Sequence, residues 1–386
     1  MIMEDKVYKM TDSELNKAYL HWMYRTIGMG NHGLFAKLRS LGPPREIFEI
    51  AKRGQLSIRL SDKCSRYKKK AALLQESAAI CDVLDEYERM TDRGILFTAI
   101  GENEYPKKLA AIPGAPGALY YVGKLPGEDA KAVAVIGARK CSEYGKAMAR
   151  QFAEVLAGAG IQVVSGMARG IDGIAQQAAL DEGGYSLGVL GCGVDICYPP
   201  ENKRLYDDLI AHGGICSEYP PGIEPRAVLF PPRNRIISGL CDGVLVIEAK
   251  ERSGTLITVD MALEQGREVY AIPGRATDPL SRGCNMLIRQ GAGLVMSPQE
   301  LLHELKSDYR ETSAYRQQTL PISDEIRGWL LQLLDYQPIS IEMIQRKYAD
   351  AYNSHISVSK LYHELLQLCA DGLAGQISGS YYVRKG

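Results

Sequence analysis

The segment Phe230 to Leu240, FPPRNRIISGL, places two arginines around an asparagine, directly after two prolines and before an apolar run of helical spacing. We expect the helix to begin after the prolines. Its first turn carries the positive end of the helix dipole, so Arg233 and Arg235 need a compensating anion there. A guanidinium matches a phosphate, but also a carboxylate of the protein such as Glu218 or Glu248. We favour a phosphate for at least one arginine, because two cations call for more than one carboxylate.

Phe230, which stands directly before the prolines, is a candidate platform for a nucleobase. Proteins that bind single-stranded nucleic acid without sequence preference combine phosphate-holding cations with aromatic rings, and stacking contributes roughly 1–3 kcal/mol per base. The alternative is that Phe230 is a core residue beneath the edge of a sheet. Both interpretations stay open.

Strand and helix patterns that would position these residues alternate from about residue 94 onward. In an open parallel sheet, ligands collect beyond the carboxyl ends of the strands. The alternation predicts an α/β fold with an extended, Rossmann-like, open and mostly parallel sheet with right-handed crossovers. The predicted strands are GILFTAI, AVAVIGAR, IQVVSG, SLGVLG, GICSEY, GVLVIEA and EVYAIPG, and two of the predicted helices are YGKAMARQFAEVLAGAG and SGTLITVDMALEQG.

The turns after the predicted strands share one composition, because glycines stand beside arginine, lysine or asparagine. Glycine lets backbone N–H groups approach an anion closely, and helix N-termini direct them toward it. We expect Asp172, which has the opposite sign, to cap the next helix near Ile174 or to brace Arg169. The candidate residues for single-stranded nucleic acid are Gly137, Arg139, Ser165, Gly166, Arg169, Asn202, Lys203, Phe230, Arg233, Asn234 and Arg235.

The residues that a dinucleotide site, a catalytic site or a metal site would require are absent from the sequence pattern. The first turn reads GARKCSEYG instead of G-x-G-x-x-G, and Val164 and Ser165 stand where a dinucleotide site needs an acid. Between residues 131 and 300 the one histidine is His212, at a predicted helix end. Cys192 and Cys197 have no further ligand at metal spacing, so we interpret them as buried thiols. The sequence therefore predicts a binding protein without catalytic residues, cofactor or metal.

Composition shifts divide the chain into four predicted parts. Residues 1–92 read as a helical domain resembling a sterile-alpha-motif or helix-hairpin-helix unit, residues 93–304 hold the sheet, and residues 305–320 form a polar linker. Residues 321–386 contain three amphipathic helices and the hairpin pattern LAGQISGSYYVRK, which together predict a winged helix. This last part has six Lys and Arg against seven Asp and Glu, whereas a winged helix that grips duplex DNA carries a basic face.

The composition of the whole chain is that of a globular protein with 386 residues. Lysine plus arginine and aspartate plus glutamate number 46 each, so an anion site must be a local cluster. Nine cysteines without a C-x-x-C pair fit reduced thiols in the cytoplasm. The first residues lack an apolar signal core, and no run reaches the roughly 18 apolar residues of a membrane helix. We expect a cytoplasmic protein that does not contact membranes.

Taken together, the motifs resemble the DNA-processing protein A family, also called DprA or Smf. The segments GARK, SGMARGID, GCGVDICYPPENKRLY, SEYPPG, FPPRNRIISGL, SGTLIT and GCNMLIRQGAG occur in this order between about residues 131 and 295. The resemblance implies an extended Rossmann fold that binds single-stranded DNA and loads the recombinase RecA onto it in natural transformation, without an enzymatic reaction. It also implies a homodimer through the segments ITVDMALEQGREVYAIPG and NMLIRQ. The positions it assigns to DNA are Arg139, Lys203, Phe230, Arg233 and Arg235.

Two other functions remain as alternatives. The sheet also resembles that of phosphoribohydrolases, nucleotide-processing enzymes with a P-G-G-x-G-T-x-x-E motif. The nearest segment here is ERSGTLIT, and Thr258 stands where the catalytic glutamate is required. A transcriptional regulator with a nucleotide-sensing sheet is the third interpretation, and the acidic balance of the predicted winged helix argues against it.

Overall fold

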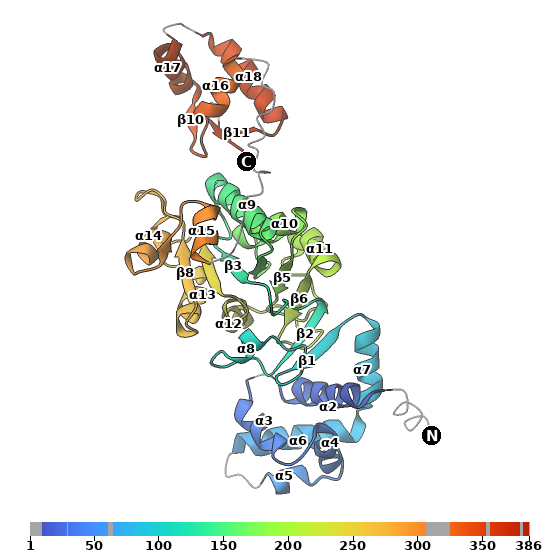
Figure 1. The fold of residues 1–386 in the computed structure, drawn as a ribbon. Coiled ribbons are helices and arrows are strands. Elements are labelled where there is room, and N and C mark those ends of the chain that lie inside the picture. The colour runs from blue at the N-terminus through green and yellow to red at the C-terminus, as the bar shows by residue number, and fades with distance from the viewer. Residues whose placement is uncertain are drawn as a thin grey trace.

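A nine-stranded sheet forms the centre of the chain (Figure 1). The computed structural model describes residues 10–28, 30–60, 65–305, 325–352, 356–378 and 381–385. The strand order is β1-β2-β6-β5-β4-β3-β7-β8-β9. The strands are β1 Leu96–Ala99, β2 Ala118–Gly123, β3 Ala132–Ile136, β4 Gln162–Ser165, β5 Ser186–Val189, β6 Gly214–Ser217, β7 Gly243–Val246, β8 Glu268–Ala271 and β9 Gly293–Leu294. Neighbours from β6 to β9 pair in parallel, whereas β2 is antiparallel to both β1 and β6. The predicted open, mostly parallel sheet is confirmed.

Helices cover both faces of the sheet because successive strand residues point to opposite sides. On β3, Val133 and Val135 belong to one apolar cluster, whereas Ala134 and Ile136 belong to another. The first cluster contains side chains of α9 Glu143–Gly158, α10 Ile171–Asp181 and α15 Pro298–Glu304. The second contains side chains of α8 Lys107–Ala110, α12 Phe230–Gly239, α13 Gly254–Glu264 and α14 Arg282–Arg289. Helix α11, Lys203–His212, contacts β5 and β6.

The connections change direction at β3. The chain first adds β4, β5 and β6 on one side of β3, and then returns to add β7, β8 and β9 on the other side. Loops that leave the carboxyl ends of β3 and β7 therefore diverge, which leaves a crevice between them. In open α/β sheets this switch point is the usual position of a ligand.

Helix α12 corrects one expectation. It begins at Phe230 and includes Pro231 and Pro232 in its first turn, so the prediction that the helix starts after the prolines is wrong. Proline is tolerated there because the first N–H groups of a helix have no intrahelical acceptor and its fixed φ suits the helix. Arg233 consequently stands one turn into the helix.

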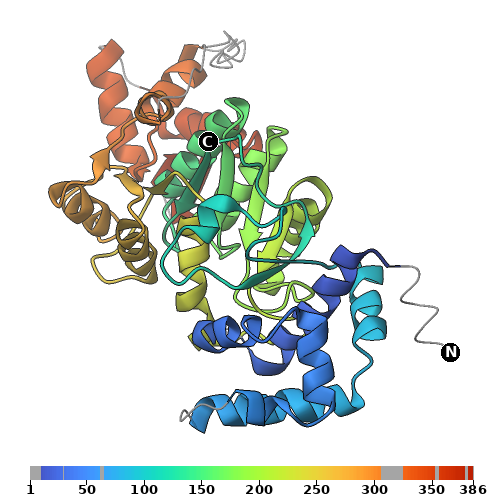
Figure 2. The same cartoon turned by 60° about the horizontal axis from the view of Figure 1, so that its bottom comes forward.

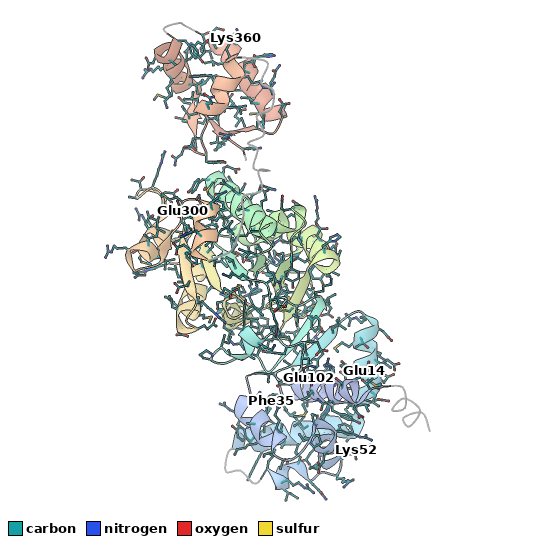
Figure 3. All side chains as sticks on the ribbon, viewed as in Figure 1. Glu14, Phe35, Lys52, Glu102, Glu300 and Lys360 are labelled. Atoms are coloured by element: carbon teal, nitrogen blue, oxygen red, sulfur yellow. The ribbon has the colours of Figure 1, made fainter. Side chains whose placement is uncertain are left out.

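Six helices in the described N-terminal residues pack together at the β1–β2 edge of the sheet, and α2 contacts β1 (Figure 2). They are α2 Asp12–Ile27, α3 His32–Arg39, α4 Pro44–Lys52, α5 Leu56–Arg59, α6 Ser65–Ile80 and α7 Val83–Asp92. Trp22 is fully buried among them, and its Nε1 donates to Ser77 Oγ at 3.0 Å. Glu102, which follows β1, lies where these helices meet the sheet and accepts from Asn16 Nδ2 at 3.2 Å (Figure 3). One apolar cluster joins the helices to Phe97 and Tyr120 of the sheet.

The C-terminal part has its own small core around Leu330, Leu361 and Tyr382. Its elements are α16 Glu325–Leu333, β10 Ile339–Ser340, α17 Ile341–Tyr352, α18 Val358–Ala370, β11 Ala374–Ser378 and β12 Tyr381–Arg384, with strand order β10-β12-β11. The three predicted helices and the hairpin are present, and β10 is an additional strand. The winged-helix assignment and the domain boundaries stay predictions, because residues 306–324, which hold most of the predicted linker, lie outside the described residues.

Candidate functional site

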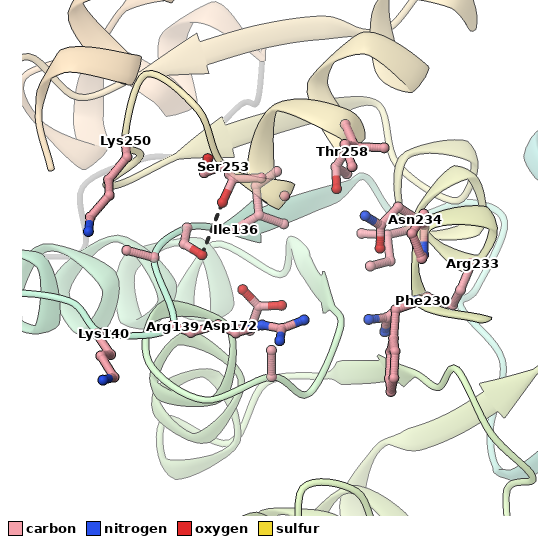
Figure 4. A pocket seen from close by; sticks show the side chains of 18 of the residues that line it. Ile136, Arg139, Lys140, Asp172, Phe230, Arg233, Asn234, Lys250, Ser253 and Thr258 are labelled. Carbon is pink, nitrogen blue, oxygen red and sulfur yellow. Dashed lines mark hydrogen bonds between the residues drawn. The ribbon is translucent and has the colours of Figure 1, made fainter. Parts of the chain in front are cut away.

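A cavity of about 480 Å³ lies at the switch point, beyond the carboxyl ends of β3 and β7 (Figure 4). Three segments form most of its lining: residues 136–140 after β3, residues in the first two turns of α12, and residues 250–258 that lead into α13. The hydroxyl of Thr255 donates to the carbonyl of Gly137 at 3.2 Å, which ties the first segment to the third. The fold therefore places the cavity where its topology predicts a ligand.

Three cations surround the opening. Arg139, Lys140 and Lys250 line the cavity and are exposed. Within the described part of the chain, none of the three forms an ion pair or a side-chain hydrogen bond. Arg139 and Lys140 follow β3, and Lys250 follows β7, so the positive charge comes from both sides of the switch point. These cations create a local positive potential on a chain whose formal net charge is zero.

The Arg233 side chain is buried and hydrogen-bonded within the protein. Only 4% of the residue is exposed, and Nη1 donates to the carbonyl of Gly166 at 2.9 Å and to the carbonyl of Val189. Burial lowers the pKa of Arg233 to about 10, while the charge of Asp172 acts in the opposite direction. Arg233 therefore remains a cation at neutral pH and joins the carboxyl ends of β4 and β5 beside the cavity.

Asp172 compensates this buried charge. Its Oδ2 accepts from the backbone N–H of Gly166 at 3.2 Å, and a Cβ on Gly166 would lie within 3 Å of both Asp172 and the Arg233 guanidinium. Burial raises the pKa of Asp172, and the Arg233 charge and hydrogen bonds to the carboxylate oppose that rise. The expectation that Asp172 braces Arg169 is wrong, because Arg169 pairs with Glu201. Helix α10 also begins at Ile171, three residues before the expected start.

Phe230 stands between the main cavity and a small neighbouring one of about 30 Å³. Its ring centroid is 5.4 Å from that of Tyr198, and the Arg233 guanidinium carbon lies 5.9 Å from the Phe230 centroid. Phe230 is half-buried, and Tyr198 is 39% exposed. The two rings therefore offer an accessible aromatic surface beside the cations. The sequence did not predict Tyr198, which lies in an irregular loop without a strand-end signal.

Two of the remaining candidate side chains fasten helix α12 and the turn after β4. Arg235 Nη2 pairs with Glu218 Oε2 at 2.7 Å, and Arg235 Nε donates to the carbonyl of Gly114 at 2.9 Å. Arg235 therefore forms an ion pair with a carboxylate of the protein, which was the alternative to a phosphate contact. Asn202 Nδ2 donates to the carbonyl of Met167 at 3.0 Å, which holds the turn after β4.

Ser165 and Lys203 also have partners within the protein. The Ser165 hydroxyl is buried and donates to the carbonyl of Val135 at 2.7 Å. Lys203 is exposed, pairs with Asp207 along α11, and lies 5.4 Å from the centroid of the Tyr206 ring. Ser165, Asn202, Lys203 and Arg235 all lie outside the linings of the two cavities.

Residues 96–306 match the family model of DNA recombination-mediator protein A, which spans more than half of the chain. The chain belongs to this family. The matched region contains all nine strands of the central sheet and both cavities.

Individual members of the DNA recombination-mediator protein A family share this region. Protein Smf of Escherichia coli is 48% identical over 203 residues, which are 52% of this chain and 54% of that protein, so this chain spans about half of its length. The solved structure of DNA processing protein A from Streptococcus pneumoniae has a TM-score of 0.62 and 36% identity, covering 76% of this chain and 99% of that one. The solved structure of DNA processing protein A from Helicobacter pylori, a protein with a single-stranded DNA binding mode, has a TM-score of 0.50 and 30% identity. The match covers 55% of this chain and 97% of that one.

In this family member the structure gathers some predicted residues and separates others. Gly137, Arg139, Phe230, Arg233 and Asn234 line the main cavity, and Gly166 and Arg169 line the small one. Sequence reasoning missed Lys140, Lys250, Ser253, Thr255 and Thr258, which also line the main cavity. Lys250 follows the predicted strand GVLVIEA, so the strand-end rule that selected Arg139 would have found it. Ser253 Oγ is buried without a hydrogen-bond partner in the described structure.

The lining determines which chemistry the cavity supports. Asp172 is the one carboxylate among the described lining residues, and Arg233 compensates it. Thr258 is buried in the lining, at the position where a phosphoribohydrolase requires glutamate. No group of His, Cys, Asp and Glu side chains in the described ranges could hold a metal ion, and no helix there is long and apolar enough to cross a bilayer. Cations, hydroxyl groups and one ring are the groups that a phosphate and a base require.

Proposed function

We propose that this chain binds single-stranded DNA at the carboxyl edge of its sheet. Arg139, Lys140 and Lys250 neutralise backbone phosphates, and Phe230 supplies a platform for one base. The observation that carries this proposal is the set of three cations that have no ion-pair partner among the described residues, around a cavity whose carboxylate is already compensated. The single-stranded DNA binding mode of the H. pylori relative supports it.

Arg233, Asn202 and Ser165 act as positioning residues in this proposal, because they hydrogen-bond to backbone carbonyls of β3, β5 and the turn after β4, beside the loops that carry the exposed cations. Arg235 stabilises α12 through its ion pair with Glu218. Because Phe230 is half-buried, a base must leave its stack to reach the ring. A duplex holds its bases stacked and paired, so extracting one costs a few kcal/mol. The site therefore prefers a single strand.

The wider role is that of a recombination mediator. We propose that the chain presents bound DNA to a recombinase of the RecA class during natural transformation in the cytoplasm, without catalysing a reaction. The family assignment and the order of the motifs support this role. We further propose a homodimer through α13, β8 and α14. In support, Leu263, Leu294 and Met296 are large apolar side chains in and near these elements with 59%, 46% and 64% of their surface exposed.

The binding site is tested by fluorescence anisotropy with a labelled oligothymidine of about 20 nucleotides. Each phosphate contact on a single strand contributes about 0.7 to the slope of log K against log salt. Arg139→Ala combined with Lys250→Ala should therefore reduce the slope by about 1.4 and weaken binding about tenfold at low salt. Lys146→Ala combined with Arg150→Ala is the matched control, because these are exposed cations of α9 outside the cavity. Parent-like binding by the cavity variant would refute the proposal.

A further inference from the structure

The N-terminal helices carry a concentrated positive charge. Residues 30–75 contain eleven lysine and arginine residues and three aspartate and glutamate residues, a formal charge of +8 in a chain whose total is zero. Elsewhere in the described structure, the side-chain partners of the cations are mostly carboxylates. In residues 30–75, by contrast, Arg39, Arg66, Lys69 and Lys70 form no ion pair within the described part of the chain. These four cations therefore keep a charge that no described carboxylate compensates.

Part of this charge gathers where α3 and α6 lie together. Lys37 Nζ of α3 lies 5.2 Å from the centroid of the Tyr67 ring on α6, and Lys70 Nζ donates to the carbonyl of Ile27 just before α3. On α6, positions 66, 69 and 70 are three and four residues apart, a spacing that puts them on one side of a helix. We call the cations of this region the α3–α6 ridge: Lys37, Arg39, Arg66, Lys69 and Lys70.

The ridge is attached to the same edge of the sheet as the cavity. Arg39 Nη2 donates to the carbonyl of Ile100, the residue after the end of β1, at 3.4 Å. Because β2 is antiparallel to both β1 and β6, β1 runs parallel to β6 and to the strands that follow it in the sheet. The carboxyl end of β1 therefore lies on the edge that carries the turns after β3 and β7. Five strand spacings separate β1 from β3, about 24 Å in all.

We propose that the α3–α6 ridge binds the phosphate backbone of the same DNA strand, beyond the segment held in the cavity. A sequence-tolerant single-strand site needs a row of cations that follows the backbone, and the ridge supplies that row. Its alignment with the cavity along one sheet edge favours one continuous polyanion over a separate acidic protein. This inference rests on the proposed binding of single-stranded DNA in the cavity.

Oligonucleotide length separates the two surfaces. An oligothymidine of about 6 nucleotides occupies the cavity alone, whereas one of about 30 nucleotides reaches the ridge as well. Arg66→Ala combined with Lys69→Ala should bind the short strand like the parent. For the long strand it should lose several-fold in affinity and reduce the salt slope by about 1.4, because two phosphate contacts are absent.

Two further variants keep the test decisive. Arg66→Lys combined with Lys69→Arg retains both charges and should bind the long strand like the parent. Lys146→Ala combined with Arg150→Ala removes the same charge from α9 and should do likewise. Thermal unfolding of each variant checks that the N-terminal helices remain folded.

The possible outcomes refute different statements. If the ridge variant binds the long strand with parental affinity and salt slope, the ridge inference is wrong, and an acidic protein becomes the candidate partner for this surface. If it weakens the short and long strands equally, the ridge is not a separate extension of the site. If the Arg139 and Lys250 variant binds both strands like the parent, the proposed cavity function itself fails.

Discussion

Arg235 forms an ion pair with Glu218, with 2.7 Å between Nη2 and Oε2, while Arg233, two residues earlier, lies beside Asp172. Each of these two arginines of α12 thus lies close to a carboxylate of the protein. Among the described residues that line the cavity, Arg139, Lys140 and Lys250 are cations without an ion pair, and they come from the loops after β3 and β7. The two arginines of α12 therefore serve the protein's own structure, and the neighbouring loops supply the exposed cations.

Replacing Arg235 should affect stability more than DNA binding. Arg235→Ala leaves the Glu218 carboxylate, whose side chain is 5% exposed, without its charged partner. Removing one member of a buried pair costs about 3 kcal/mol or more in the free energy of unfolding, measured by urea denaturation. Under conditions where the variant is folded, its affinity for oligothymidine should match that of the parent. A large loss of affinity without loss of stability would assign Arg235 to the DNA directly.

Replacing Phe230 tests the aromatic platform. Phe230→Ala should lose roughly 1–3 kcal/mol of binding free energy, a 5- to 150-fold weaker affinity in fluorescence anisotropy. Phe230→Tyr keeps a ring beside Tyr198 and should retain most of the affinity. If Phe230 serves only the core, Phe230→Ala will lower the free energy of unfolding while the folded protein binds DNA like the parent.

Gly170 lets the turn after β4 approach the turn after β3 closely. It has φ 75° and ψ −131°, and a Cβ there would overlap the carbonyl oxygens of Ala138 and Arg139. Gly170→Ala should therefore destabilise the fold by about 2 kcal/mol or more and displace Arg139, weakening oligonucleotide binding. Gly183→Ala is the matched control, since its φ is 80° but no atom lies within 4 Å of the new Cβ. It should cost about 1 kcal/mol and leave affinity unchanged. Equal effects of the two variants on binding would contradict this reasoning.

His21 should make the junction of the helices and the sheet sensitive to acid. Its Nδ1 is 3.0 Å from the Tyr120 hydroxyl, and burial lowers its pKa to about 4, with the charge of Arg25 adding to the effect. Glu86, 3.9 Å from Nε2, is already paired with Arg25 at 2.6 Å. Between pH 6.5 and 4, His21 of the unfolded chain, with a pKa near 6.5, binds a proton, whereas His21 of the folded chain stays neutral. The free energy of unfolding should therefore fall by about 3 kcal/mol as the pH drops from 6.5 to 4.

His21→Gln isolates this contribution, since carboxylates also titrate in that range. Urea denaturation of the parent and the variant at several pH values should show a weaker pH dependence for the variant between pH 6.5 and 4. Parallel curves for the two proteins would show that His21 titrates with the same pKa in the folded and unfolded states.

The sequence by itself determined seven of the nine strands of the sheet and the composition of the turns at their ends; β2 and β9 were not predicted. Buried apolar runs such as AVAVIGAR mark central strands because both faces of a parallel sheet are covered. Parallel strands bring their carboxyl ends to one edge, so Gly137, Arg139 and Phe230 could be assigned to a common site from their positions after these runs. The family resemblance followed from the same turns, and the match over residues 96–306 confirms it.

Only the tertiary structure decided which of the cations face outward. A helix turns about 100° per residue, so Arg233 and Arg235, two residues apart, point in widely different directions. The sequence offered Glu218 as one possible partner of these arginines, but it could not show which arginine Glu218 pairs with, or that Asp172 lies beside the other. Pairing of charges depends on distances in space, whereas the sequence specifies only the order along the chain.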